Sequence, residues 1–327
     1  GVFKFVADVK FGTGSYTDSL LNNALGEEIP STNWFPPAED MAGLCMHPSG
    51  FMAGFSGRTV YCSDIEIPHA YPLANQYTVD YDIVGLGISG NSIVVLTTGI
   101  TYSFTGTLPQ SMSKVRIAGR QPCVSKRGIA DNGTTVIYPS ADGLVAVADY
   151  SSRLLTEALY KREQWQRDLT PTSMIGAVHD GIYYGWSGDG KSIAINFDEG
   201  RSALTTLSFD ASGVFSDLEN DDLYYVADGS IYGFQQDQDQ RRTGTWQSKE
   251  ATTQLDDRFS VARLVCDVYP ATLRVYRDGT KVADMTVNTS SGFRLPSIGR
   301  GRYWAIAVDV DGDCDNVVLS QSMREVR

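Results

Sequence analysis

The sequence predicts an all-β protein: a β-propeller of about five or six blades at 41–238, followed by a small antiparallel β-sandwich at 246–327. One phrase, a polar turn followed by alternating apolar residues, occurs five times before Trp246. Gly and Tyr are plentiful, at 32 and 17 residues, which favours strands and tight turns over long helices. From Trp246 onward the period breaks while strand-like segments continue, which indicates a second domain.

The repeated unit is a hairpin. In "DGIYYGWSGDGKSIAINFD" (180–198) a polar turn leads into a strand, a second turn with glycine and another strand. Gly and Asn supply the positive φ angles of tight hairpin turns, and Val, Ile and Tyr suit a pleated surface. The second-turn glycines are spaced 42, 44, 47 and 39 residues apart; they are Gly57, Gly99, Gly143, Gly190 and Gly229.

A period of roughly 40–50 residues is that of propeller blades, because one hairpin cannot bury its faces alone and copies stacked about an axis can. We interpret the repeated phrase as the inner hairpin of each blade. An outer strand is expected from segments such as "YDIVGLGI" (81–88) and "PTSMIGAVH" (171–179). The alternative is a non-repeating β-sandwich with evenly spaced hairpins. The expected blades lie near 41–66, 81–108, 128–150, 171–200 and 213–236.

Three segments lie outside the repeat. Residues 1–40 are predicted to form an N-terminal arm or linker, or to complete a blade; a sixth blade would come from this stretch or from sequence upstream of Gly1. A helical turn or two is expected around Thr156–Trp165, in an insertion between the third and fourth units. The polar stretch 234–246 is the expected linker to the second domain.

The C-terminal region reads as consecutive strands. The segment "RDGT" (277–280) contains the Asp-Gly pair that a type I′ hairpin turn prefers. Strands of this kind bury their apolar sides by forming two packed antiparallel sheets. The expected strands are 259–268, 272–287, 302–312 and 316–326.

The charge balance excludes a surface built to hold nucleic acid. The chain has 27 basic and 39 acidic residues, a net charge of −12, whereas phosphate binding needs clustered Lys and Arg. The short basic cluster at 240–242, with Lys249 nearby, is interpreted as a solvated linker. No apolar run reaches the roughly 18 residues of a membrane span.

The cysteines and histidines do not predict a zinc site. No CxxC occurs, and His47, His69 and His179 are scattered, without triad-like or metal-like spacing. The odd number of cysteines indicates reduced thiols, with a Cys45–Cys62 bridge open only if their two strands pair. The five cysteines are Cys45, Cys62, Cys123, Cys266 and Cys314.

One acidic turn is the remaining metal candidate. "DVDGDCDN" (309–316) has Asp at alternate positions, as calcium loops do. An EF-hand loop needs Gly at its sixth position and Glu at its twelfth, and here Gly312 is fourth and Ser320 twelfth. We therefore predict an acidic turn between two strands, without structural calcium. The candidate ligands are Asp309, Asp311, Asp313 and Asp315.

The other polar and aromatic candidates have structural interpretations. Paired carboxylates could make a propeller a glycosidase, but each candidate Asp sits beside a turn glycine, where Asp is common for local hydrogen bonding. These are Asp142, Asp180, Asp189 and Asp228. Aromatic residues that could stack on sugars are typical of cores and cross-strand pairs; they are Tyr183, Tyr184, Trp186, Tyr224 and Tyr225. We predict no catalytic residue, no cofactor and no enzymatic activity.

Several segments together resemble a family of tailed-phage virion structural proteins. They include "GFSGRTVYCSDIEIPHAYP" (54–72), "IVGLGISGNSIVVLTTGITYSFTGTLPQSMS" (83–113) and "QPCVSKRGI" (121–129), with "FRLP" (293–296) in the C-terminal region. The likeness extends over most of the chain from about Phe5, and the order of the segments carries it. Tyr71 stands where the family commonly has Trp.

The resemblance implies a tail or neck component, similar to nozzle or tail-tubular proteins that carry propeller domains. It implies assembly with itself in a ring around the DNA channel, contacts with portal, adaptor or fibre proteins, and a virion location after assembly in the bacterial cytoplasm. Stable nucleic-acid binding and a membrane span are not expected. The alternative is a tail adsorption protein that binds or depolymerises host-surface glycans.

Overall fold

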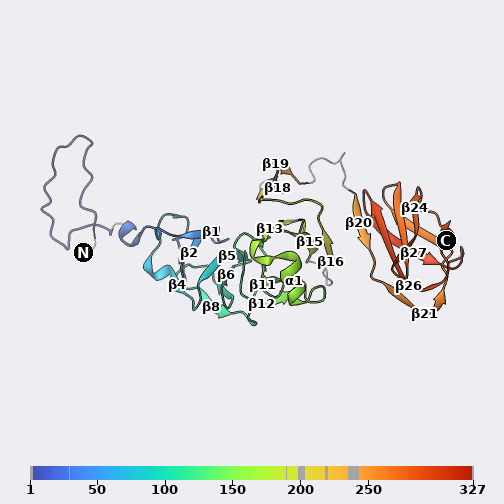
Figure 1. The fold of residues 1–327 in the computed structure, drawn as a ribbon. Coiled ribbons are helices and arrows are strands. Elements are labelled where there is room, and N and C mark those ends of the chain that lie inside the picture. The colour runs from blue at the N-terminus through green and yellow to red at the C-terminus, as the bar shows by residue number, and fades with distance from the viewer. Residues whose placement is uncertain are drawn as a thin grey trace. The chain divides into compact units, whose positions relative to one another are not determined.

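The computed structural model describes residues 3–28, 30–188, 190–197, 203–217, 220–234 and 243–325 (Figure 1). Strands form 47% of it and helices 6%, so the predicted all-β fold class is confirmed. The chain divides into two units, Gly1–Phe234 and Gln235–Arg327, and this division falls within the predicted linker. Among the described residues, no helix has the length and apolar character needed to cross a membrane.

The first unit is a succession of antiparallel sheets, each made of strands that follow one another in the chain. Four sheets have four strands each, and the fifth has three among the described residues. The first two sheets contain β1 (Ala42–Met46), β2 (Met52–Ser56), β3 (Thr59–Cys62) and β4 (Gln76–Thr78), then β5 (Ile83–Ser89), β6 (Ser92–Thr97), β7 (Tyr102–Thr105) and β8 (Ser113–Arg116). The third contains β9 (Ala130–Asp131), β10 (Val136–Pro139), β11 (Leu144–Ala148) and β12 (Ser151–Leu154). The last two contain β13 (Ile175–His179), β14 (Ile182–Trp186), β15 (Ser192–Asn196) and β16 (Ala203–Thr206), then β17 (Gly213–Asp217), β18 (Asp222–Ala227) and β19 (Ser230–Gly233).

The five sheets are the blades of a β-propeller. The first strand of each sheet contacts the first strand of the next, in the order β1, β5, β9, β13 and β17. First strands in such a row line a common axis, and the later strands of each sheet lead away from it. The predicted propeller is therefore confirmed, and the described residues supply five of its blades.

The assignment of inner and outer strands was wrong. The segments expected to be outer, 81–88 and 171–179, contain β5 and β13, which are first strands on the axis. The repeated phrase instead forms the second and third strands of every blade, such as β10 and β11 around Gly143. The turn residues mark a tight hairpin wherever it lies, so they do not report its distance from the axis.

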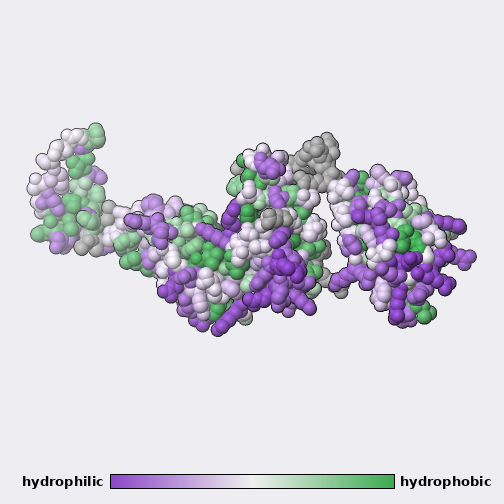
Figure 2. All heavy atoms as spheres, viewed as in Figure 1, coloured by the Kyte–Doolittle hydropathy of each residue, from purple (hydrophilic) through white to green (hydrophobic). Residues whose placement is uncertain are grey.

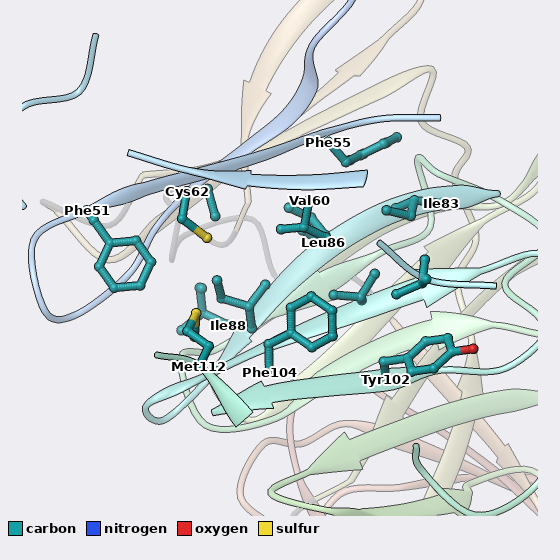
Figure 3. Close-up of a cluster of buried hydrophobic side chains, with 14 residues drawn as sticks. Phe51, Phe55, Val60, Cys62, Ile83, Leu86, Ile88, Tyr102, Phe104 and Met112 are labelled. Atoms are coloured by element: carbon teal, nitrogen blue, oxygen red, sulfur yellow. The ribbon is translucent and has the colours of Figure 1, made fainter. Parts of the chain in front are cut away.

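The central strand β6 of the second blade is buried on both faces because a blade lies on either side of it. In β6, Ile93 and Val95 belong to the core between the first and second blades (Figure 3), while Val94 and Leu96 belong to the core between the second and third. All four side chains are fully buried. Alternation along the strand thus directs successive residues into two different cores, which explains the continuous apolar run.

The predicted helix lies slightly later than expected. Residues 156–160 form a turn, and α1 follows at Arg162–Leu169. Its Trp165 is fully buried and donates a hydrogen bond from Nε1 to the carbonyl of Ser140, 2.9 Å away, which fastens the insertion to the third blade. Short 3-10 helices occur at η1 (Pro30–Asn33), η2 (Leu73–Asn75) and η3 (Pro171–Ser173).

The second unit is the predicted antiparallel β-sandwich. One sheet has the order β20–β26–β23–β24 with β21 also paired to β26, and the other has the order β25–β22–β27. Asp278 and Gly279 have φ angles of 49° and 77°, as the expected type I′ turn requires. The strands are β20 (Gly244–Gln247), β21 (Ala251–Asp257), β22 (Val261–Cys266), β23 (Ala271–Arg277), β24 (Thr280–Val287), β25 (Phe293–Arg294), β26 (Gly301–Val310) and β27 (Cys314–Ser320).

The strands of Cys45 and Cys62 do not pair with each other. Cys45 in β1 and Cys62 in β3 both pair with Ala53 of the intervening strand β2. Two strand spacings place their Cα atoms roughly 9–10 Å apart, beyond the reach of a disulfide. The condition under which this bridge was considered is therefore not met.

Candidate assembly interface

The acidic turn of the second unit connects strands through its carboxylates. Asp309 forms an ion pair with Arg274 and accepts a hydrogen bond of 2.7 Å from Thr245 Oγ1. Asp311 accepts one of 2.6 Å from Thr243 Oγ1. These contacts tie β26 to β23 and to the start of β20.

The four candidate calcium ligands are not gathered around one point. Asp309 and Asp311 are engaged as above, and Asp313 and Asp315 are exposed. Within the described ranges, no group of three or more His, Cys, Asp or Glu side chains is arranged to hold a metal ion. The segment forms a turn between β26 and β27, as its spacing predicts. The absence of bound calcium stays a prediction.

The turn carboxylates of the propeller are spread over different blades. Asp180 and Asp228 both have φ of 50° and are followed by glycines with φ near 70°, the geometry of type I′ turns. Asp142 forms an ion pair of 2.9 Å with Arg162 of α1. Asp189 lies outside the described residues. The structure thus places the described candidates on turns of the third, fourth and fifth blades and not as a pair.

Two of the histidines are packing residues. His47 is fully buried, stacks on Phe51 with ring centroids 4.3 Å apart, and accepts a hydrogen bond at Nδ1 from the Ser49 N–H. Burial lowers the pKa of His47, which therefore favours the neutral ring. His69 packs edge-on against Trp34 at 5.4 Å.

The third histidine has partners that the sequence spacing did not reveal. His179 lies 3.6 Å from Asp180 and 4.0 Å from Asp221, which comes from the β17–β18 turn of the next blade. Neighbouring first strands bring these two turns together, although they are 41 residues apart in the sequence. Both carboxylates are exposed, so water screens their charges, and the group links turns of two neighbouring blades.

The candidate sugar-binding aromatics are mostly in the core. Tyr183 is fully buried and donates its hydroxyl to the carbonyl of Gly128 at 2.8 Å. Tyr184 and Trp186 stack on each other 6.1 Å apart between the fourth and fifth blades, and Tyr225 joins the same core. Burial raises the pKa of Tyr184 to about 12. These rings stabilise contacts between blades and do not form an exposed stacking platform.

A basic dipeptide bridges the first and last blades. The Nζ of Lys126 lies 5.7 Å from the centre of the Phe55 ring in the first blade, and Arg127 donates a hydrogen bond to the carbonyl of Ser212, next to the first strand of the fifth blade. The Arg127 carbonyl accepts from the N–H of Gly176 in the fourth blade. This loop therefore contacts the first, fourth and fifth blades. The predicted cluster at 240–242 lies outside the described residues, and Lys249 is exposed.

The fifth blade has an uncovered apolar face. Phe215 of β17 and Ile231 of β19 are 64% and 75% exposed, and strand register places Val226 of β18 on the same face. The opposite face carries Leu223 and Tyr225, which pack against the fourth blade. Alternation along the strands therefore gives this sheet two apolar faces, of which one is covered.

The first blade has a similar uncovered face at the other end of the array. Leu44 and Met46 of β1 are each 58% exposed, and Met52 of β2 lies opposite Met46. The reverse face, with Phe55 and Val60, is buried against the second blade. Large exposed apolar patches mark interaction sites, so the two end faces form the candidate assembly interface. One sign of this interface was present in the sequence: both the odd-numbered and the even-numbered positions of β1 and of β17 include apolar residues.

Comparisons with known proteins give structural neighbours only. No family model matches the chain, and no curated protein matches it. Among solved structures, Hsv2 from Kluyveromyces lactis is 12% identical over 60% of this chain and 61% of that one, with a TM-score of 0.40. BamB from Moraxella catarrhalis is 15% identical over 85% of each chain, with a TM-score of 0.37.

A third neighbour is the WD40 β-propeller domain of Doa1, which is 7% identical over 83% of this chain and 78% of that one, with a TM-score of 0.39. The chain thus spans about three fifths of the length of the Kluyveromyces lactis Hsv2 structure that it matches. All three TM-scores are below 0.5, so the propeller assignment rests on the order and contacts of the blades described above.

Proposed function

We propose that this chain is a structural subunit of a bacteriophage tail or neck that assembles with itself in a ring around the DNA channel. The observation that carries the proposal is the pair of uncovered apolar faces, one on the first blade and one on the fifth. Apolar surface of this kind is stabilised by burial against another protein surface. A chain with two different apolar faces, one at each end of the array of blades, can associate head to tail into a ring.

The resemblance to phage structural proteins supports the same role. Its segments fall on features that build the array: 54–72 includes the hairpin between β2 and β3, and 121–129 is the loop whose Lys126 and Arg127 bridge the first and last blades. In this proposal portal, adaptor or fibre proteins are the neighbours, and the protein is not an enzyme. Its location is the virion tail, after assembly in the bacterial cytoplasm.

The charge of the chain fits a channel along which DNA slides. A net charge of −12 repels phosphates, and a wall that neutralised phosphates would release counterions and retain the DNA. The two cations of the 121–129 loop are engaged by the protein itself, Lys126 by the Phe55 ring and Arg127 by a backbone carbonyl. The glycan-binding alternative needs exposed aromatics beside carboxylates, whereas Tyr183, Tyr184 and Trp186 are buried.

The experiment is to locate the chain in purified virions. We expect antibody or gold labels on the chain to mark the tail or neck and to be released with tail fragments. The control is a label on a capsid protein, which should stay with the heads. Absence of the chain from purified virions would overturn the proposal, and release of reducing sugars from host polysaccharide by the purified chain would favour the alternative.

A further inference from the structure

The N-terminal arm contains a strand-like segment that lies outside the sheets. From residue 3 to residue 11 the sequence FKFVADVKF places apolar side chains at every odd position, with Lys4, Val6, Asp8 and Lys10 between them. Apart from Val6, this alternation is the pattern of a strand with one apolar face. In the structure, this segment forms a bridge at its base, where Phe5 exchanges hydrogen bonds of 2.9 and 2.8 Å with Glu27 and Gly26, and its Lys10 carbonyl accepts hydrogen bonds from Thr13.

The apolar face of this segment is exposed. Phe3 is 76% exposed, Phe11 is fully exposed, and Phe5 and Val9 are about half exposed. Figure 2 shows hydrophobic residues over the arm. At ~200 Å² for each phenylalanine, the three rings present roughly 500 Å² of apolar surface. A standard protein interface buries about 800 Å² on each partner, so the arm alone supplies more than half of one.

Among the described residues, the fifth blade has three strands where every other blade has four, and β19 forms the edge of these three. Ile231 lies on this edge strand, and Phe215 lies on the same face of the sheet two strands away, in β17. The next part of the sequence, 235–245, contains no large apolar residue and so offers no apolar side chain to cover that face.

The charges of the two surfaces are complementary. Residues 213–234, which form the fifth blade, include five acidic residues and no Lys or Arg. The segment 3–11 has two lysines and one aspartate. Opposite charges of this kind favour the correct pairing and hasten association.

We propose that residues 3–11 of one copy add to β19 of a second copy as the fourth strand of its fifth blade. The phenylalanines of the arm then extend the apolar face that carries Ile231 of β19, with Phe215 further along the same face on β17, and the backbone of the arm pairs with the strand that forms the edge among the described residues. Each copy gives one arm and receives another, a heterologous contact that closes into a ring. The proposal deepens the ring assembly proposed above and rests on it.

The first test is the mass of the oligomer by light scattering. Phe3→Asp with Phe11→Asp in the arm should lower the assembled fraction at least tenfold, and Ile231→Asp in the receiving blade should do the same. The matched control is Leu255→Asp, because Leu255 is 77% exposed in the second unit and should leave the mass unchanged. An unchanged mass in both the arm and the blade variants would overturn the proposal.

The second test asks which copy supplies the arm. In a Cys314→Ser background, chains with Val9→Cys are mixed with chains with Ile231→Cys and treated with a flexible bismaleimide. We expect a product of twice the chain mass in the mixture and not in either sample alone. A chain that carries both substitutions and links only within itself, when diluted, would show that the arm folds back onto its own blade and would overturn the exchange.

The two proposals fail in different ways. If virions contain the chain and its ring persists in the arm variants, the arm proposal is wrong and the tail proposal stands. If the purified chain forms an arm-dependent oligomer but is absent from virions, the tail proposal is wrong and the strand exchange stands.

Discussion

Replacement of Ile93 and Leu96 by alanine tests whether a central strand is buried on both faces. The two residues lie on opposite faces of β6, in the cores with the first and third blades, and both are fully buried. Each substitution removes three carbon atoms, about 2.4 kcal/mol of transfer free energy at ~0.8 kcal/mol per group. The cavity left behind raises the expected loss to about 3–4 kcal/mol for each.

The assay is unfolding in urea, monitored by hydrogen exchange in peptides from β5 to β7. This readout reports on the second blade alone, so unfolding of the second unit does not contribute to the signal. The double variant should lose about 6–8 kcal/mol, because the two sites belong to separate cores and their effects add. Leu73→Ala, at a 65% exposed position in η2, is the control and should cost less than ~1 kcal/mol. In a two-layer sandwich, one face of β6 would meet solvent; a loss below ~1 kcal/mol for either single variant would refute the stacked blades.

Four further predictions concern thiols, acid stability, calcium and DNA. A thiol reagent at neutral pH should label Cys314 quickly and the other four cysteines slowly, because burial raises the pKa of Cys45, Cys62 and Cys123 to about 12; a second fast thiol would contradict this burial. A hydrogen bond from Tyr102 and the charge of Arg116 lower the pKa of Asp80, so its stabilisation is full above the unfolded-state pKa and is lost as pH falls through the folded-state value. Asp80→Asn should therefore flatten the acid side of the Tm–pH profile, and an unchanged profile would show that Asp80 does not contribute to acid unfolding. A chelator should leave Tm unchanged; a drop that calcium restores and that Asp311→Asn abolishes would show a calcium site in the acidic turn. Filter binding at physiological salt should show no retention of duplex DNA, and saturation near the micromolar range would reveal a basic surface.

Local chemistry made the hairpins predictable. Asp180, Asp228 and Asp278 each precede a glycine in a turn with positive φ, and each joins two apolar segments with the alternation of strands. These signals are carried by a few adjacent residues, so a single sequence contains them in full. The position of a hairpin relative to the propeller axis depends on contacts between blades, which is why β5 and β13 were expected on the wrong side.

The candidate interface was harder to predict for the same reason. Leu44 and Phe215 look like ordinary strand residues in the sequence, and only the order of the blades shows that their faces have no neighbour within the described array. The clasp of His179 with Asp221 likewise joins turns of two blades. By contrast, the misplaced Gly312 is a local signal, and it favoured a structural turn over a calcium loop; Asp309 and Asp311 do bond to neighbouring strand residues, while the lack of calcium stays a prediction.

The most direct measurement is an electron cryomicroscopy reconstruction of virions that carry a label at the C-terminus of this chain. We expect the label on a ring of identical subunits in the tail or neck, with the propeller blades resolved and the DNA channel along the ring axis. A label confined to the capsid shell, or virions without the chain, would contradict the proposed role.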